Sequence, residues 1–192
     1  MNKVERFISP EFANVLYNHT LNEAGYTDDF VSIGSKIRSD DSIMTLLLSE
    51  LKPRVEELYG KRLHETCSFY RVYSQGQDLR KHLDRPACEV SVTLFLGCNF
   101  DWQWPIFVDG KPYGMGQGEG LIYKGCEQLH WREPLVYVPH LNATNHQEPV
   151  NLIHSQVYLH YIEAGGQFDP EHKWDAAHAA ELGHEIPQKT ST

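Results

Sequence analysis

The sequence predicts a mainly β fold of the α+β class, in which an antiparallel sandwich or jelly roll follows helices in the first third of the chain. From residue 63 onward, short segments with β-strand character recur between Gly and Pro residues. No helical pattern separates these segments, which argues against a parallel α/β sheet. The 192 residues, 41% of them hydrophobic, suit one domain with a sizeable core. We expect a single domain over 1–192, with a helical part at 1–62, a β core at 63–164 and a tail at 165–192.

The first helix is expected in "SPEFANVLYNHTL", residues 9–21. Ser9 is a suitable N-cap, and Pro10 stands at the first helical position, where its missing N–H costs nothing. The apolar residues at helical spacing are Phe12, Val15 and Leu16.

The second helix is expected in "SDDSIMTLLLSELKPRVEELYGKR", residues 39–62. Asp41 or Ser42 is the expected cap, Pro53 predicts a break or kink, and Gly60 lies just past the expected end. The apolar face comprises Ile43, Leu46, Leu47 and Leu51. Both helices need a sheet to cover their apolar faces, so we expect them to pack on the outside of the β core.

The strands are expected in five segments with period-two alternation or β-branched and aromatic enrichment. They are "HETCSFYRVYS" (64–74), "CEVSVTLFLG" (88–97), "WPIFVDG" (104–110), "EGLIYKG" (119–125) and "NLIHSQVYLHYIEA" (151–164). Segment 135–151 is longer than a hairpin needs, and loops of that length are often lids or binding loops. Segment 168–192 is Ala-rich in part and predicts a short helix before a frayed end.

The charge distribution disfavours several classes of partner. The formal charge is −9 and Lys and Arg form no stripe, so nucleic acid is an unlikely partner. The chain has neither a signal peptide nor an apolar run near the roughly 20 residues that span a bilayer, so we expect a cytoplasmic protein. The four cysteines lack CxxC spacing and are expected to be free thiols. The oligomeric state is not predicted.

A metal site is suggested by His82 and Asp84, which stand two apart and therefore point to one side of a strand. His130 follows an apolar strand and a Gly turn and enters another strand, which makes it the best third ligand. Two neutral imidazoles and a carboxylate on one face leave the opposite positions open, which suits non-haem Fe(II) that binds a cosubstrate and O₂. Ordinary surface residues are the alternative, because a His-x-Asp pair alone is a weak signal.

The context of this pair resembles the prolyl-hydroxylase branch of the iron- and 2-oxoglutarate-dependent oxygenases. In "YSQGQDLRKHLDR" the tyrosine Tyr73 and the glycine Gly76 precede His82 and Asp84 as in that family. Strand 88–97, the segment "GEGLIYKG", the distal His130 and the closing "SQVYLHYIEA" are also similar, so the resemblance covers about 66–164.

The resemblance implies a double-stranded β-helix (jelly roll) core with N-terminal buttressing helices. It further implies that the catalytic residues His82, Asp84 and His130 hold Fe(II) and that 2-oxoglutarate chelates the iron. The implied enzyme is a dioxygenase that consumes O₂, hydroxylates a peptidyl or small-molecule substrate, and releases succinate and CO₂.

The residue that binds the distal carboxylate of 2-oxoglutarate is less clear, because the family usually places Arg or Lys on the last core strand and this chain has neither between Arg132 and Lys173. His154 aligns with that position and would need a proton to take the role. Arg132, on the same side of its strand as His130, is the main competitor. We expect Arg132 or His154, assisted by the Tyr73 hydroxyl, with Lys124 as a third candidate.

Two rival functions belong to other classes. The first is a cupin-like metalloenzyme that does not use 2-oxoglutarate, for which an additional ligand among His140, His146, His154 and His160 would speak. The second is a non-catalytic binding domain on the same scaffold, which would be favoured only by a broken metal triad.

Overall fold

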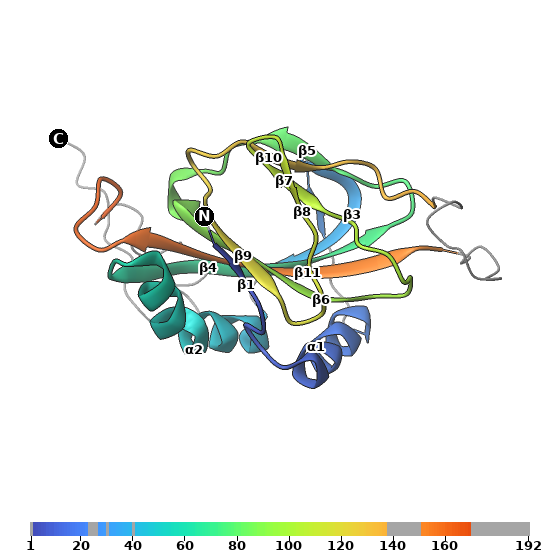
Figure 1. The fold of residues 1–192 in the computed structure, drawn as a ribbon, viewed down its shortest axis with the longest axis horizontal. Coiled ribbons are helices and arrows are strands. Elements are labelled where there is room, and N and C mark those ends of the chain that lie inside the picture. Colours follow the sequence, from blue (N-terminus) through green and yellow to red (C-terminus); the bar gives the residue numbers. More distant parts are fainter. Residues whose placement is uncertain (1, 23–26, 30, 40, 138–150, 170–192) are drawn as a thin grey trace.

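The strands form two antiparallel sheets that face each other, and two helices cover the outer face of the larger sheet (Figure 1). This architecture comes from a computed structural model that describes residues 2–22, 27–29, 31–39, 41–137 and 151–169. It confirms the predicted mainly β sandwich with helices packed outside.

The larger sheet has seven strands in the order β1-β9-β6-β11-β4-β3-β2. Their bounds are β1 (Asn2–Val4), β2 (Thr27–Asp29), β3 (Ser32–Ser39), β4 (Leu63–Ser74), β6 (Val90–Cys98), β9 (Gly120–Lys124) and β11 (Ile153–Glu163). The long strand β11 pairs with β4 on one side and β6 on the other, so it forms the centre of this sheet.

The smaller sheet has four strands in the order β5-β10-β7-β8. Their bounds are β5 (Leu79–His82), β7 (Ile106–Val108), β8 (Lys111–Tyr113) and β10 (His130–Arg132). A short 3₁₀ helix, η1 (Pro86–Cys88), connects β5 to the larger sheet. All five strand segments expected after residue 63 are strands, and β5 and β8 are further short ones.

Helix α1 (Pro10–Asn22) begins where Ser9 and Pro10 predict, because the Ser9 hydroxyl accepts a hydrogen bond from the Phe12 N–H at 3.2 Å. Helix α2 (Ser42–Tyr59) is capped by Asp41, whose carboxylate accepts from two backbone N–H groups. Gly60 ends α2 with φ 83° and donates its N–H to the Glu56 carbonyl. Both helix starts and the second helix end are therefore confirmed.

The predicted break at Pro53 is wrong, since α2 is a single helix of 18 residues that passes through it. Pro53 is exposed, whereas Leu48, Leu51 and Val55 on the opposite face are buried. Burial of those side chains on both sides of Pro53 outweighs the one backbone hydrogen bond that proline cannot make.

The buried faces of the helices differ from the predicted ones by about one residue of rotation. Phe12, Val15, Ile43 and Leu46 are exposed, although the pattern placed them in the core. The buried residues are instead Ala13, Leu16 and Thr20 in α1, and Met44, Thr45, Leu47, Leu48, Leu51 and Val55 in α2. Apolar residues occur on several sides of both helices, so spacing alone does not select the face that meets the sheet.

The prediction that 1–62 is only helical is also wrong, because β1, β2 and β3 lie in this part of the chain. Strand β3 pairs with β4 through Lys36 and Val72 and the following pairs, and thereby extends the larger sheet. Its sequence "SIGSKIRS" carries no strand pattern, so pairing with a neighbouring strand decides its conformation.

The larger sheet presents different chemistry on its two faces. From β11, Val157, Leu159 and Tyr161 join the apolar core beneath the helices. Tyr158 and His160, which alternate with them, line the space between the two sheets. The polar residues of the sandwich interior therefore lie on the side away from the helices, where the smaller sheet faces them.

Some expectations fall on residues outside the described ranges, namely most of loop 135–151 and of the helix expected in 168–192. Within the described residues, no helix has the length and apolar character needed to cross a bilayer.

Candidate metal centre

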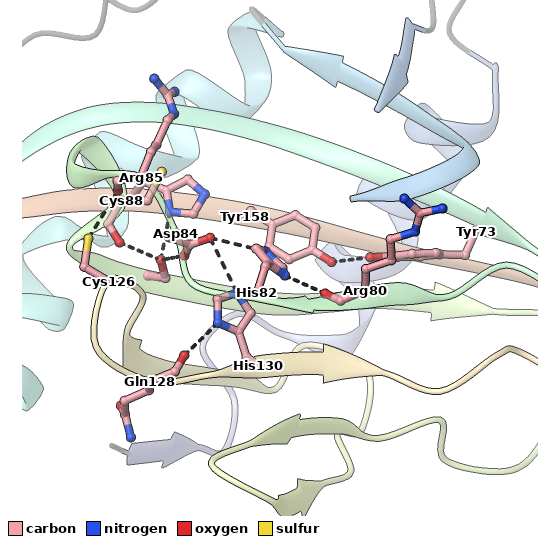
Figure 2. Close-up of polar contacts among 12 residues, drawn as sticks. Tyr73, Arg80, His82, Asp84, Arg85, Cys88, Cys126, Gln128, His130 and Tyr158 are labelled. Atoms are coloured by element: carbon pink, nitrogen blue, oxygen red, sulfur yellow. Dashed lines mark hydrogen bonds and ion pairs between the residues drawn. The ribbon is translucent and has the colours of Figure 1, made fainter. Parts of the chain in front are cut away.

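The structure brings His82, Asp84 and His130 together at one end of the sandwich interior (Figure 2). His82 ends β5 and pairs in register with His130, the first residue of β10. One ligand atom from each of the three residues lies within 4.8 Å of the others. The Nε2 atoms of His82 and His130 are 3.5 and 3.4 Å from Asp84 Oδ1. The predicted triad is therefore assembled.

Backbone carbonyls determine which ring nitrogens face the centre. His82 Nδ1 lies 2.7 Å from the Arg80 carbonyl oxygen, and His130 Nδ1 lies 2.9 Å from that of Gln128. A carbonyl can only accept, so each Nδ1 carries a hydrogen and the Nε2 of the neutral ring presents a lone pair. Two such lone pairs and a carboxylate converge without a hydrogen between them, and a divalent cation is the partner that this donor set fits.

Asp84 is held from behind by hydrogen bonds to its second oxygen and to its backbone. The Ser91 hydroxyl donates to Asp84 Oδ2 at 2.7 Å and lies 3.0 Å from His160 Nδ1, while the Asp84 N–H donates to the Gly125 carbonyl at 2.9 Å. Burial by itself would raise the pKa of Asp84, but the ring nitrogens of His130 and His82 outweigh it and lower the pKa well below its usual value. The carboxylate is thus ionised and oriented for a cation.

Gly125 allows Asp84 to occupy this position. A Cβ atom built on Gly125 would lie 2.2 Å from Asp84 Oδ2, 2.3 Å from the Cys88 carbonyl oxygen and 2.6 Å from Ser91 Oγ. Sequence reasoning treated Gly125 only as a turn residue and did not single out Ser91. No local pattern marks either one, because the contacts join segments far apart in the chain.

No described residue adds a fourth ligand to the triad. His154 and His160 lie elsewhere in the interior, and His140 and His146 are outside the described ranges. Within the described residues, the donor set that a cupin-like site would need is not completed.

The predicted cosubstrate residues Arg132, His154 and Tyr73 lie between the sheets, farther along the interior. Arg132 is only 1% exposed and donates to the Trp104 carbonyl at 2.5 Å and to Gln156 Oε1 at 3.2 Å. It makes no ion pair with any described residue, and its Nε has no hydrogen-bond partner among them. A buried guanidinium without a counter-ion is costly, so this position favours an anionic ligand.

His154 is a buried aromatic contact rather than a charged group. Its ring stacks on Phe95 with centroids 4.6 Å apart and meets the edge of Trp104 at 5.0 Å. Burial, followed by the nearby charge of Arg132, lowers the pKa of His154 well below its usual value. The ring is therefore neutral at physiological pH, which leaves Arg132 as the charged member of the predicted pair.

Two other predicted groups have clear partners. The Tyr73 and Tyr158 hydroxyls are hydrogen bonded at 2.8 Å, a contact drawn in Figure 2. Lys124 forms a surface ion pair with Glu127 at 3.0 Å and does not line the interior cavity. Trp104 of the predicted aromatic edge is buried and donates its indole N–H to the Glu133 carbonyl, so it packs in the core.

A cavity of about 390 Å³ opens beside the triad. All three triad residues line it, together with Tyr158 and with Arg71 of β4. Sequence reasoning missed Arg71, although one signal was present: it stands two residues before Tyr73 in a predicted strand and therefore faces the same side.

No protein-family model and no curated protein matches the sequence. Solved structures do match, including a prolyl-4-hydroxylase from Pseudomonas putida, with a TM-score of 0.56 and 14% identity over 83% of this chain and 91% of that one. The viral collagen prolyl hydroxylase of Paramecium Bursaria Chlorella virus-1, in a 2-oxoglutarate complex, matches with a TM-score of 0.54 and 12% identity over 83% and 95%. HygX from Streptomyces hygroscopicus, with nickel and 2-oxoglutarate bound, matches with 0.53 and 8% over 82% and 81%.

These likenesses show a shared fold at low sequence identity. The two facing antiparallel sheets are accordingly those of the double-stranded β-helix, as the resemblance implied. The coverage of both chains is high, so the likeness extends over the sandwich and the helices that support it.

Proposed function

We propose that the protein is an Fe(II)- and 2-oxoglutarate-dependent dioxygenase that oxidises a small-molecule or peptidyl substrate. The observation that carries the proposal is the convergence of two neutral imidazole nitrogens and one carboxylate inside a double-stranded β-helix. Three ligands on one face leave positions for a cosubstrate and O₂, which is the arrangement of the non-haem iron oxygenases. The 2-oxoglutarate-bound neighbours on the same fold support this assignment.

In this proposal His82, Asp84 and His130 hold the iron. Bound iron would couple the oxidative decarboxylation of 2-oxoglutarate, which gives succinate and CO₂, to the oxidation of a substrate C–H bond. The Arg80 and Gln128 carbonyls fix the two imidazole tautomers.

Arg132, with Tyr73, is the proposed partner of the distal carboxylate of 2-oxoglutarate. Arg132 follows His130 by two residues on β10, a separation of about 6.6 Å that matches the reach of a short dicarboxylic acid. Its charge lacks a counter-ion among the described residues, and a charge-assisted bond to a carboxylate would supply one. His154, the other predicted candidate, is the weaker one because its ring is neutral.

Buried tyrosines enclose the proposed site. Burial raises the pKa of both Tyr123 and Tyr158 well above the usual value, so both keep their protons at physiological pH. The Tyr123 ring meets His130 edge-on with centroids 4.8 Å apart. These rings position a metal ligand and exclude bulk water from one side of the cavity.

The test combines a binding measurement with a product measurement. Calorimetric titration under anaerobic conditions should give one divalent metal per chain and 2-oxoglutarate binding only after the metal is present. With Fe(II) and O₂, the protein should release succinate slowly even without its substrate. Asp84→Ala should lose all three properties while its circular dichroism spectrum stays unchanged, because Asp84 supplies the one anionic ligand.

Two outcomes would contradict the proposal. Metal binding without any 2-oxoglutarate binding would favour the cupin-like alternative. An Asp84→Ala variant that binds metal as tightly as the unchanged protein would remove the metal assignment itself.

A further inference from the structure

We propose that the cavity beside the metal centre takes a small molecule that carries a carboxylate, and that Arg71 binds this carboxylate. The inference rests on the proposed function and deepens it by naming a ligand class and a binding residue. It starts from the position of Arg71, which lines the cavity together with the three triad residues.

The Arg71 side chain is buried and held in place by aromatic rings. Only 2% of the residue is exposed. Its guanidinium carbon lies 5.9, 5.7 and 5.8 Å from the ring centroids of Phe69, Tyr73 and Tyr158. A planar guanidinium that rests against rings is pre-organised and loses little freedom when a ligand binds. This geometry suits the two parallel hydrogen bonds that a carboxylate accepts from arginine.

The charges around the cavity favour an anion. Of the described residues that line it, Arg71 and Arg85 are cations and Asp84 is the one carboxylate. Asp84 faces the proposed metal, whose two positive charges exceed its own negative charge. The cavity is therefore electropositive when the metal is bound, and such a cavity concentrates ligands of opposite charge.

A second buried cation adds to this field. Gln156 is the register partner of Arg71 on the neighbouring strand, and its side-chain oxygen accepts from Arg132. Arg71 and Arg132 both act on Tyr158, where their charges oppose the effect of burial on its pKa. Two guanidinium groups thus lie in the interior near one tyrosine, which is enough to bind two carboxylates.

The size and lining of the cavity limit the ligand. A volume of about 390 Å³ is typical of small-molecule sites. Apolar side chains form part of the wall, among them Val31, Ile37 and Leu79. A ligand with an apolar body and one carboxylate matches this surface. The carboxylate belongs either to 2-oxoglutarate or to the molecule that is oxidised, and the two sources are separable by experiment.

The first arm measures 2-oxoglutarate binding by calorimetry on the Zn(II)-loaded protein, because Zn(II) is redox-inert. Arg71→Met, Arg132→Met and the control Arg62→Met are compared; the Arg62 side chain is 84% exposed and on the surface. Loss of a charge-assisted contact should weaken binding roughly tenfold or more. If Arg71→Met has this effect, Arg71 binds the cosubstrate.

The second arm uses acetate, butyrate, hexanoate, phenylacetate and 3-phenylpropionate, each paired with its amide, as probes of the Zn(II)- and 2-oxoglutarate-loaded protein. Ligand-observed NMR should detect at least one acid and not its amide. If Arg71→Met abolishes that signal and leaves 2-oxoglutarate binding unchanged, Arg71 binds the substrate carboxylate. Arg71→Lys, which keeps the charge but lacks the fork, should give an intermediate loss and guards against a variant that fails to fold.

The proposal is overturned if Arg71→Met and Arg71→Lys change neither 2-oxoglutarate binding nor acid binding, or if no acid binds in the second arm and 2-oxoglutarate is unaffected in the first. Failure of the proposed function gives a different result. In that case 2-oxoglutarate does not bind the metal-loaded unchanged protein, and the acid probes are then applied to the protein with Zn(II) alone.

Discussion

At the scale of single residues, the metal centre depends on one glycine as much as on its three ligands. Gly125 accepts a hydrogen bond from the Asp84 N–H and leaves space for the Asp84 carboxylate. The atoms that a Cβ would meet include two backbone-anchored or hydrogen-bonded groups, the Cys88 carbonyl and the Ser91 hydroxyl. A side chain at position 125 therefore has no soft direction in which to move its neighbours.

Gly125→Ala is expected to weaken metal binding by about 10- to 100-fold, the cost typical of a disturbed outer-shell contact. The physical reason is displacement of Asp84 Oδ2, which lies 2.2 Å from the added carbon. Calorimetric metal titration measures the change. Gly110→Ala is the control, because a Cβ there meets nothing within 4 Å and only the positive φ is strained. Equal metal affinities in the two variants would contradict the role assigned to Gly125.

At the scale of secondary-structure elements, α2 shows how packing overrides a local breaker. Its buried face, which includes Met44, Leu48 and Val55, lies against the larger sheet, so the helix continues past Pro53. The backbone hydrogen bond that Pro53 cannot donate remains a local defect in an otherwise regular element.

Pro53→Ala should therefore stabilise the protein, by about 1–3 kcal/mol in the free energy of unfolding, because alanine restores the missing N–H and removes the ring clash. Denaturation with guanidinium chloride measures the change. Glu57→Ala, at another exposed position of α2, should stay within about 0.5 kcal/mol. A destabilised Pro53→Ala variant would mean that the proline fits the native helix better than its position implies.

At the scale of the whole molecule, the larger sheet separates two interiors. The side under the helices is apolar, whereas the side that faces the smaller sheet holds Arg71, Arg132, His154 and the metal triad. Ionisable groups in the second interior link folding to pH. His154 is the clearest case, since burial and Arg132 lower its pKa and keep it neutral in the folded state.

His154 should make the folded state less stable in acid. Below a pH of about 6.5 the unfolded chain protonates this histidine and the folded protein does not, so the unfolded state binds more protons and stability falls as pH falls. His154→Phe, which keeps a ring against Phe95, should lose less stability than the unchanged protein between pH 7 and 5.5, by about 1 kcal/mol. Thermal and denaturant unfolding across this range measure the difference, and parallel curves would show that His154 is protonated in both states.

The sequence by itself determined the elements whose signals are local. Ser9, Asp41 and Gly60 mark helix ends through their own caps, and the strands after residue 63 carry their own alternation. The pair His82 and Asp84 was visible because a separation of two residues places both side chains on one side of an extended segment.

Only the tertiary structure decided the rest, because the deciding contacts join segments far apart in the chain. Strand β3 forms by pairing with β4, and the sheet selects which face of each helix is buried. The space that Gly125 leaves for Asp84 and the entry of Arg71 into the metal cavity likewise depend on neighbours from other strands. A local pattern reports propensity and periodicity, whereas burial and close approach are properties of the assembled sheets.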